Sequence, residues 1–362
     1  MKVLHIIPDF PSGGAEMVVL TYLRRLKGDK ECETMAVSLS SNQGRLYEKM
    51  AAEEGLPIEY LGQDIHDNGL MPRIRLIRQL RKYIKSKHPD VVHIHLSILW
   101  IVCLAITGLR IKGLFHTLHS DPSKTSIGKN LYIDRFCYRF YKIKPLCLNQ
   151  EMADVANRIF KRTDAGVLTN GIDLDKYKDL HRSKYRSLYD IPDDAFVLGH
   201  VGRFNKVKNH KLIISVFSEL NKQRKDAYLV LVGEGELLQD VISQARELGC
   251  LSHIVFTGAR NDVPELMGMM DVFIFPSLYE GLGIVLIEAQ AAGLRCVISE
   301  TIPHEAVVRT DTNEIGLNEE PQMWVDAILG NNHNYIIPTK KLYDYSVVGV
   351  IETLKGYYNQ SV

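Results

Sequence analysis

The chain has 362 residues, of which 46% are hydrophobic and 24% are charged, and its 44 Lys and Arg nearly balance its 43 Asp and Glu. This length exceeds one ordinary hydrophobic core and predicts two domains, and the composition is that of a soluble globular protein. The formal net charge of +1 argues against a bulk nucleic-acid binder.

Cysteines and apolar runs bear on the compartment. No C-x-x-C pair and no zinc-ligand spacing is present, so we expect six buried, reduced thiols. The first apolar run is too short for a signal peptide, and no apolar window approaches the ~18 residues of a membrane span. These features predict a cytoplasmic protein. The cysteines are Cys32, Cys103, Cys137, Cys147, Cys250 and Cys296.

In the first half of the chain, short apolar runs alternate with segments of helical period, which predicts a parallel sheet covered by helices. The predicted strands are Val3–Ile7, Val37–Leu39, Val91–Ile94, Leu114–Leu118 and Leu146–Leu148, and the predicted helices lie at about 14–26, 45–54, 72–87, 98–109 and 129–142.

The alternation restarts after about residue 195, which predicts a second α/β domain. Two such sheets in series predict two doubly wound Rossmann-like domains, with the polar stretch Asp173–Asp194 as their connector and an amphipathic helix at 343–358. The predicted strands of this half are Val197–Val201, Tyr228–Val232, Ile254–Phe256, Val272–Phe275 and Cys296–Ile298, and its predicted helices lie at about 210–223, 236–248, 262–270 and 283–292.

Two acidic residues flank the start of a predicted helix in the second half. Glu280 ends the loop after a strand, and Glu288 lies one to two turns inside the helix that follows. Gly281, Leu282 and Gly283 open that helix, whose free N–H groups attract phosphate. A carboxylate can accept two sugar or ribose hydroxyls at once. The alternative is a solvated Glu280 and a surface Glu288, but Glu288 sits among apolar residues and needs a partner.

A basic loop follows the strand that ends at Val201. Arg203 and Lys208 lie in it, and both residue types bind phosphate, Arg as a planar fork and Lys as a point charge. Ligands bind beyond the carboxyl ends of strands in open α/β sheets, so this loop is a candidate diphosphate site. A plain basic surface loop is the alternative.

Two glycines follow the first strand. Gly13 and Gly14 would let the backbone approach a ligand, and the next helix points its N-terminus there. An ordinary turn has the same pattern.

Four histidines lie at or near the ends of two neighbouring strands, and such a group raises the question of a metal. No ordered set of Cys or carboxylates joins them, so we expect no metal site. His119 is interpreted as a site residue, whereas a buried, hydrogen-bonded role is equally open for His116 and favoured for His93. The four are His93, His95, His116 and His119.

Three other patterns have simpler explanations. Asp173 and Asp175 form a D-x-D pattern but follow a turn signal, so a turn or helix cap is expected. Gly233 and Gly235 begin a dinucleotide-binding fingerprint that lacks its third glycine. The segment 72–87 is a basic amphipathic helix, which is usually a solvated face but could contact anionic lipid headgroups.

Together these motifs resemble the family-4 retaining glycosyltransferases of the GT-B fold, and the resemblance spans nearly the whole chain. The strongest motif is Glu280 and Glu288 within EGLGIVLIEAQAAG, and the Arg203/Lys208 loop, the GGAE motif and the Asn170–Asp173 junction agree in order and spacing. Arg295 stands where the family often has Pro, and 148–151 differs from the usual Ser-containing stretch.

The resemblance implies an α/β fold with two domains facing across a cleft: an acceptor-binding domain at 1–170, on which 343–362 packs back, and a nucleotide-sugar-binding domain at 171–342. Glu288 would bind the ribose, and Glu280, with the Gly281–Gly283 segment, the donor sugar. Arg203, Lys208, Gly13 and Gly14 would hold the diphosphate. His119 would lie near the reacting sugar, and His95 and Glu16 would contact the acceptor.

The implied activity is a retaining hexosyl transfer from a nucleotide-sugar, with UDP expected, to a saccharide or lipid-linked acceptor in capsule, exopolysaccharide or lipopolysaccharide synthesis. No metal or other cofactor is expected, and Arg203 and Lys208 would stabilise the departing diphosphate. Domain closure about 165–195 would complete the site. The alternatives are a non-catalytic nucleotide-sugar-binding protein and an epimerase or phosphorylase of the same fold.

Overall fold

The computed structural model describes residues 1–11, 13–63, 69–330 and 339–361. The chain forms two compact units. The N-terminal unit is Met1–Gly171 together with Val347–Val362, and the C-terminal unit is Ile172–Ser346.

The described part of the N-terminal unit holds a seven-stranded parallel sheet in the order β3-β2-β1-β4-β5-β6-β7. Its elements are β1 (Lys2–Ile7), α1 (Gly14–Arg25), β2 (Glu33–Ser38), α2 (Leu46–Glu53), β3 (Ile58–Tyr60), α3 (Leu70–Lys87), β4 (Val91–His95), α4 (Leu99–Ile106), β5 (Gly113–Leu118), α5 (Pro122–Thr125), α6 (Lys129–Tyr141), β6 (Lys144–Cys147), α7 (Gln150–Phe160), β7 (Gly166–Val167) and α15 (Val347–Asn359).

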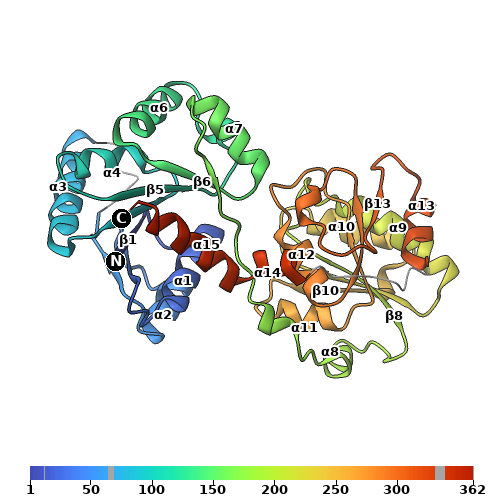
Figure 1. Ribbon diagram of the computed structural model, residues 1–362. Helices are drawn as coiled ribbons and strands as arrows, with labels where there is room; N and C mark the ends of the chain where they lie inside the picture. The colour runs from blue at the N-terminus through green and yellow to red at the C-terminus, as the bar shows by residue number, and fades with distance from the viewer. Residues whose placement is uncertain (12, 64–68, 331–338, 362) are drawn as a thin grey trace. The chain divides into compact units, whose positions relative to one another are not determined.

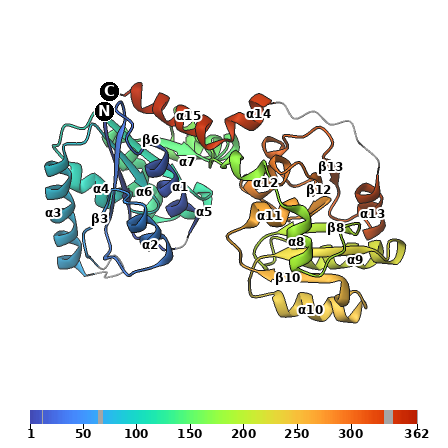
Figure 2. The same cartoon turned by 90° about the horizontal axis from the view of Figure 1, so that it is seen from below.

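Helices cover both faces of this sheet, because side chains alternate along each strand. Leu4 and Ile6 of β1 pack with buried residues of α3, α4, α6 and α7. Val3 faces the other side, where Tyr22 of α1 meets Leu354 of α15. Helix α15 therefore belongs to the core of the N-terminal unit, and it lies beside α1 in both views (Figures 1 and 2).

The described part of the C-terminal unit holds a six-stranded parallel sheet in the order β10-β9-β8-β11-β12-β13. Its elements are the 3-10 turn η1 (Leu174–Tyr177), α8 (Arg182–Leu188), β8 (Phe196–Val201), α9 (His210–Gln223), β9 (Ala227–Val232), α10 (Leu238–Glu247), η2 (Leu251–His253), β10 (Ile254–Gly258), α11 (Val263–Gly268), β11 (Val272–Phe275), α12 (Ile284–Ala291), β12 (Arg295–Ser299), η3 (His304–Ala306), β13 (Asn313–Ile315), α13 (Pro321–Leu329) and α14 (Thr339–Asp344).

The interpretation of 173–194 as a connector is wrong for most of its length. The segment holds η1 and α8, and Arg186 of α8 is fully buried. Its guanidinium donates to the Met269, Asp193 and Ala195 carbonyls at 3.0, 2.6 and 2.8 Å and pairs with Asp271 at 2.9 Å. These partners satisfy the buried charge, so the segment is anchored in the C-terminal unit.

Two strand predictions need smaller corrections. The strand predicted at Val37–Leu39 runs from Glu33 to Ser38, and that predicted at Leu146–Leu148 runs from Lys144 to Cys147. All six cysteines are buried, and none is in a disulfide. Within the described residues, no helix combines the length and apolarity needed to cross a bilayer.

Candidate active site

In the C-terminal sheet, β8 pairs with β9 on one side and with β11 on the other. From the boundary between β8 and β11, the chain winds outward in both directions, through β9 and β10 on one side and through β12 and β13 on the other. The loops after β8 and β11 therefore diverge and leave a crevice at the carboxyl ends of the strands. Arg203 and Lys208 lie in the first loop and Glu280 in the second. The backbone joins the two loops, because Leu278 N–H donates to Val207 O at 2.8 Å.

Lys208 and Glu280 form an ion pair at this crevice. Lys208 Nζ lies 2.7 Å from Glu280 Oε1, and the side chains are only 17% and 13% exposed. Lys208 Nζ also lies 4.7 Å from the centroid of the Phe275 ring. An ammonium has three donors, so the pair orients Glu280 and leaves Lys208 able to bind a phosphate oxygen.

Arg203 is placed differently from Lys208. Its side chain is 72% exposed and lies 3.3 Å from Glu236 Oε2, which is itself exposed. A long side chain on a solvated loop adjusts its position at little cost. Arg203 is therefore at the edge of the crevice, and the structure does not fix its guanidinium beside the Lys208–Glu280 pair.

Gly233 and Gly235, which form only an incomplete dinucleotide fingerprint, both lie in the loop after β9 and allow it to contact the Arg203 loop closely. A Cβ on Gly233 would lie 2.2 Å from Gly202 O, and one on Gly235 would lie 2.4 Å from Phe204 O. Phe204 N–H accordingly donates to Glu234 O at 2.9 Å. The glycines thus allow the loop after β9 to pack directly against the Arg203 loop.

Glu288 lies on α12 and is half-buried. Burial raises its pKa to about 7, and the Tyr177 hydroxyl, which donates to the carboxylate, opposes that rise. Tyr177 comes from η1, in the segment first interpreted as a connector. The predicted partner of Glu288 is therefore a phenol, and the carboxyl group is close to half-ionised at neutral pH.

The segment before α12 has a defined geometry. Gly283 is the N-cap and has φ of 76°, a left-handed conformation that favours glycine. A Cβ there would also lie 3.2 Å from Phe275. Gly281 is exposed, but Leu282 is buried in the core, so only its backbone can face a ligand.

The D-x-D residues lie at η1, an element that contacts α12. Asp173 is the N-cap residue of η1, and Asp175 pairs with Lys178 at 2.7 Å on the surface. This arrangement agrees with the expected turn or cap.

In the N-terminal unit, the glycines after β1 are not equivalent. A Cβ on Gly13 would lie 2.3 Å from Glu16 Oε2, whereas one on Gly14 would meet nothing within 4 Å. Glu16 is 4% exposed, and its carboxylate accepts the Gly13 backbone N–H. Glu16 therefore folds back to hold the start of α1, and its contact with an acceptor stays a prediction.

His119 and His95 form a hydrogen-bonded row with a third histidine, His5, which was not among the predicted site residues. His95 Nδ1 lies 3.1 Å from His119 Nε2, and His95 Nε2 lies 3.0 Å from Nδ1 of His5. His95 is fully buried and is placed to orient His119, and its contact with an acceptor stays a prediction. His5 points to the same face of β1 as His93 and His95 do on β4, and this alternation was the available signal.

This row of rings has a preferred proton arrangement. His5 Nε2 is buried and makes no hydrogen bond among the described residues. A buried nitrogen without a partner is tolerated better as a lone pair than as an N–H donor. His5 Nδ1–H then donates to His95 Nε2, and His95 Nδ1–H donates to His119 Nε2. The proton of neutral His119 therefore resides on Nδ1.

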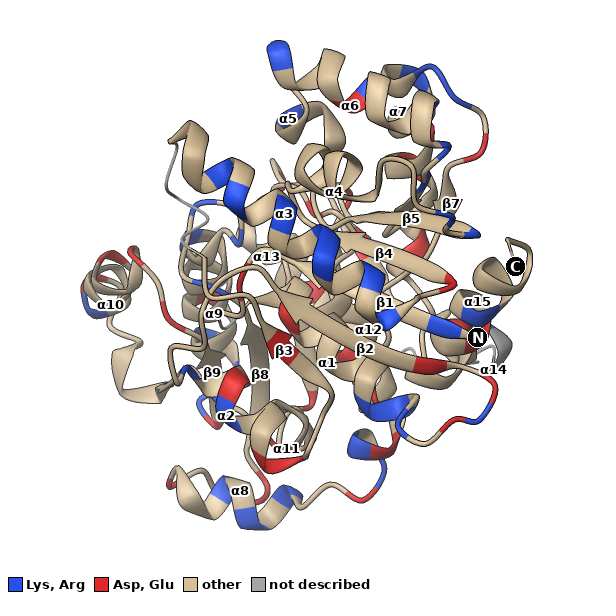
Figure 3. Ribbon diagram, turned by 90° about the vertical axis from the view of Figure 1, so that its left-hand side faces the viewer, with Lys and Arg blue, Asp and Glu red and all other residues tan. Residues whose placement is uncertain are grey.

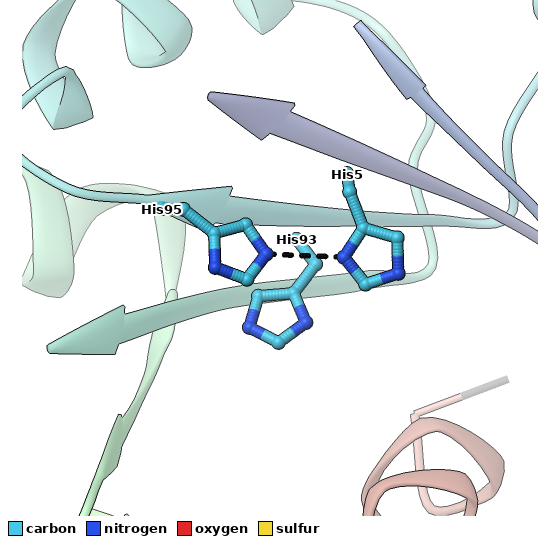
Figure 4. Close-up of side chains that lie close together, drawn as sticks. All are labelled: His5, His93 and His95. Carbon is cyan, nitrogen blue, oxygen red and sulfur yellow. Dashed lines mark hydrogen bonds between the residues drawn. The ribbon is translucent and has the colours of Figure 1, made fainter. Parts of the chain in front are cut away.

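His5, His93 and His95 lie close enough to raise the question of a metal, since one ring nitrogen of each lies within 4.8 Å of the others (Figure 4). Hydrogen bonds account for their arrangement. His93 bonds the Tyr358 hydroxyl at 2.6 Å and Thr117 at 2.7 Å. A metal ion would have to replace several of these bonds. Burial lowers the pKa of His5 to about 3 and that of His119 to about 4.

A cavity of about 430 Å³ opens at the carboxyl ends of β4 and β5. His116 lines it and is fixed by the Tyr138 hydroxyl at 2.7 Å and by the Leu96 carbonyl at 2.9 Å. The cavity combines apolar walls with a few polar groups, as ligand pockets do. Its lining includes Arg73, Trp100, His116, His119, Ile133 and Asp134.

Comparison with known proteins identifies the family of the chain. Residues 12–176 match the family described as "Glycosyltransferase Family 4", and residues 181–330 match "Glycosyl transferases group 1". The chain belongs to the family-4 glycosyltransferases. The two matches cover both units and carry the loops described above.

Two named bacterial proteins are similar in sequence to this chain over most of its length. EpsF of Bacillus subtilis (strain 168), named as a glycosyltransferase, is 29% identical over 344 residues, which is 90% of this chain and 86% of EpsF. The UDP-Gal:alpha-D-GlcNAc-diphosphoundecaprenol alpha-1,3-galactosyltransferase of Escherichia coli is 25% identical over 259 residues, which is 67% of this chain and 66% of that enzyme.

Solved structures confirm the GT-B fold class. Anabaena HepE in complex with UDP has a TM-score of 0.80 and 17% identity, over 99% of this chain and all of HepE. A glycosyltransferase from Rickettsia africae has a TM-score of 0.82 and 17% identity, over 99% of this chain and 98% of its own. The predicted α/β class is thus correct for both units of this family-4 glycosyltransferase.

The two departures from the usual family sequence have structural roles. Arg295, which replaces the usual Pro, donates to the Ala327 and Gly330 carbonyls at 2.9 and 2.7 Å and so caps the C-terminus of α13. Asn149 caps the N-terminus of α7 by accepting from Met152 N–H at 2.8 Å. Neither change involves the Lys208–Glu280 pair.

Proposed function

We propose that this glycosyltransferase moves a sugar, with retention of anomeric configuration and without a metal cofactor, from a UDP-sugar to a lipid-linked or saccharide acceptor in cell-surface polysaccharide synthesis. The observation that carries the proposal is the Lys208–Glu280 pair at the switch point of the C-terminal sheet. Work at the inner face of the cytoplasmic membrane fits this acceptor class.

The donor takes its contacts from the C-terminal unit. Lys208 binds the diphosphate with the donors that Glu280 leaves, and Arg203 adds its guanidinium from the edge of the crevice. Glu280 accepts hydroxyls of the donor sugar. Glu288 accepts the two ribose hydroxyls, which favours its ionised form. UDP is the proposed nucleotide because the E. coli relative is named for UDP-Gal and HepE was solved with UDP.

The acceptor takes its contacts from the cavity of the N-terminal unit, where His119 presents its Nδ1–H to the reacting sugar. A lipid-linked acceptor is proposed because the E. coli relative is named for a diphosphoundecaprenol-linked sugar.

The chemistry proposed needs no protein nucleophile. The bond from the anomeric carbon to the diphosphate oxygen breaks, and the acceptor oxygen attacks the same face through an oxocarbenium-like state. The acceptor proton passes to a phosphate oxygen of the leaving UDP. Lys208 and Arg203 stabilise the charge that develops on that oxygen, which is the task otherwise given to a metal.

The test is a transfer assay in EDTA with UDP-, GDP- and ADP-sugars and a polyprenyl-diphosphate-linked hexosamine acceptor. We expect UDP release and glycosylated lipid with one UDP-sugar, and NMR should show the product in the donor's anomeric configuration. An inverted product would refute retention, and a requirement for a divalent ion would refute metal independence.

The same assay separates the alternatives. A non-catalytic binding protein would bind the donor tightly yet release no UDP with any acceptor. An epimerase would convert the donor without an acceptor, and a phosphorylase would need free phosphate as co-substrate.

A further inference from the structure

Helix α6 presents apolar side chains to solvent along its outer face. Tyr132, Ile133, Phe136 and Phe140 are 71%, 43%, 60% and 65% exposed, and Ile127 just before the helix is 62% exposed. Their spacing of three and four residues places the four helical ones on one side of α6. Cys137 and Tyr138 fill the opposite side and are buried in the core. Helix α6 is therefore apolar on both its inner and its outer faces.

This exposure is concentrated rather than scattered. Five of the ten large apolar side chains that are exposed among the described residues of the N-terminal unit lie between Ile127 and Phe140. The Phe136 and Phe140 rings stack on each other, with centroids 5.3 Å apart. A contiguous apolar patch of this kind marks an interaction surface. We call Ile127, Tyr132, Ile133, Phe136 and Phe140 the α6 patch.

Positive charge borders the α6 patch. Lys129, Arg139 and Lys142 are exposed on or just after the helix. Beside them lies a cavity of about 510 Å³ with five cationic side chains and one carboxylate, which already pairs with Arg162 at 2.6 Å. The charged residues of that lining are Arg135, Arg139, Lys142, Lys161, Arg162 and Asp164. Aromatic rings bordered by cations are complementary to the interface of an anionic bilayer.

The α6 patch also reaches the proposed acceptor cavity. Ile133 belongs to the patch and lines the cavity that holds His119, and Asn130 of the same helix lines it too. A bilayer against α6 would therefore meet the rim of this cavity. This step rests on the proposed lipid-linked acceptor, whereas the patch and its charges do not.

Helix α3, which sequence analysis considered for membrane contact, is less suited to insertion. Its apolar side chains Leu76, Leu80 and Ile84 are buried in the core. The solvent-facing side carries cations, shown in blue along α3 in Figure 3, with exposed apolar residues only at Leu70 and Met71 among those described. Its contact with lipid would therefore be mainly electrostatic.

We propose that the α6 patch is a membrane-docking surface that inserts Phe136 and Phe140 into the interfacial region of an anionic bilayer, with the neighbouring Lys and Arg side chains on lipid phosphates. Full-length protein should bind vesicles of equal parts phosphatidylglycerol and phosphatidylcholine, and should bind pure phosphatidylcholine at least about tenfold more weakly. High salt should weaken the binding.

The deciding variant is Phe136→Ser/Phe140→Ser. We expect it to bind the anionic vesicles about tenfold or more weakly than the wild type, because two large apolar groups no longer leave water. The matched control Leu248→Ser/Met323→Ser removes two comparably exposed apolar side chains of the C-terminal unit and should bind like the wild type. A Phe140→Trp variant should show a blue-shifted emission with vesicles and quenching by brominated lipid.

Three results would overturn this proposal: no binding of the wild type to anionic vesicles, equal binding by the double variant, or a self-associating wild type whose dimer the double variant abolishes. Failure of the proposed function looks different. Phe136 and Phe140 do not line the proposed acceptor cavity, so the double variant should retain donor turnover with a water-soluble acceptor even if docking is lost.

Discussion

Lys208 Nζ and Glu280 Oε1 are 2.7 Å apart although 72 positions separate the two residues in the chain. We predict that Lys208→Ala lowers stability by about 1–3 kcal/mol, since it leaves a largely buried carboxylate without its cation. Turnover should fall by at least about a hundredfold, because charge on the departing diphosphate loses its main partner. Chemical denaturation and UDP-release assays would measure both effects.

A double-mutant cycle distinguishes pairing from independent roles. Lys208→Ala/Glu280→Ala should regain part of the lost stability but none of the activity, with a coupling energy of about 1–2 kcal/mol. The control is Lys222→Ala, which breaks an exposed pair with Glu219 and should change little. Additive losses of stability in the cycle would mean that the pair does not form in solution.

Donor affinity should depend on the protonation of Glu288. Burial raises its pKa to about 7, and only the carboxylate accepts both ribose hydroxyls. Affinity should therefore fall about tenfold per pH unit below pH 7 and level off above it. Calorimetric titrations with the donor over about three pH units centred on pH 7 would show the slope.

The raised pKa of Glu288 also affects the stability of the fold, and high pH, which favours donor binding, should lower that stability. A carboxyl whose pKa is raised on folding stabilises the fold at low pH, and this contribution is lost as pH rises from the unfolded value through about 7. Glu288→Gln should thus be more stable than the wild type at alkaline pH, by about 2 kcal/mol, while losing donor affinity. Glu247→Gln on the exposed end of α10 is the control. A pH-independent difference between Glu288→Gln and the wild type would refute the raised pKa.

His95 should determine the tautomer of His119. In the wild type, ¹⁵N spectra of labelled histidine should place the His119 proton on Nδ1. His95→Ala should allow both tautomers and lower kcat by about 10–100-fold with a smaller change in KM, as other positioning residues do. His95→Gln should restore part of both, because its amide can donate to His119 Nε2.

His93→Gln is the matched control for a purely structural effect. The substitution disturbs the same buried cluster. The wild-type His93 side chain, however, bonds Tyr358 and Thr117 rather than His119. It should therefore lower stability while the His119 tautomer stays fixed. If His93→Gln and His95→Ala shift the tautomer equally, the role assigned to His95 is wrong.

The buried histidines should make the protein sensitive to acid. Burial lowers the pKa of His5 to about 3 and those of His116 and His210 to about 4. At a pH below the ordinary histidine pKa, the unfolded chain therefore binds more protons than the folded protein. Their stabilising contribution is complete above about pH 6.5 and is lost as pH falls, by at most about 1.4 kcal/mol per unit for each histidine. Urea unfolding across this range would measure the loss.

One substitution isolates this effect. His5→Asn should reduce the pH slope of stability by about one proton, because His5 is fully buried in the fold. Equal slopes for the wild type and His5→Asn would show that His5 is protonated in the fold or already neutral in the unfolded chain.

The sequence predicted those elements whose signal is local. The run Val3–Ile7 is apolar along its whole length because both faces of β1 are covered, and α9 begins and ends at the predicted residues 210 and 223. Strands β7 and β13 have two and three residues, too few for any periodicity, and each exists only through pairing with a neighbour. Helix α8 escaped detection because Arg186, its anchor, takes a partner from Asp271, 85 positions away.

The site residues with a local sequence signal were also predictable, whereas their contacts with distant segments were not. Lys208 and Glu280 were identifiable because each follows a strand, but their contact depends on sheet order. Tyr177 could not be assigned to Glu288, and His5 could not be assigned to His95, because those neighbours come from distant segments. Arg203 was predicted beside Lys208 from spacing alone, whereas its loop leaves it exposed and paired with Glu236.

The most direct test of the central claim is UDP binding by calorimetry to the wild type, Lys208→Ala, Glu288→Ala and the control Lys222→Ala. We predict that the wild type and Lys222→Ala bind UDP alike, and that each site variant, still folded by circular dichroism, binds at least about tenfold more weakly. Equal binding by all four proteins would contradict the placement of the donor at the carboxyl ends of β8 and β11.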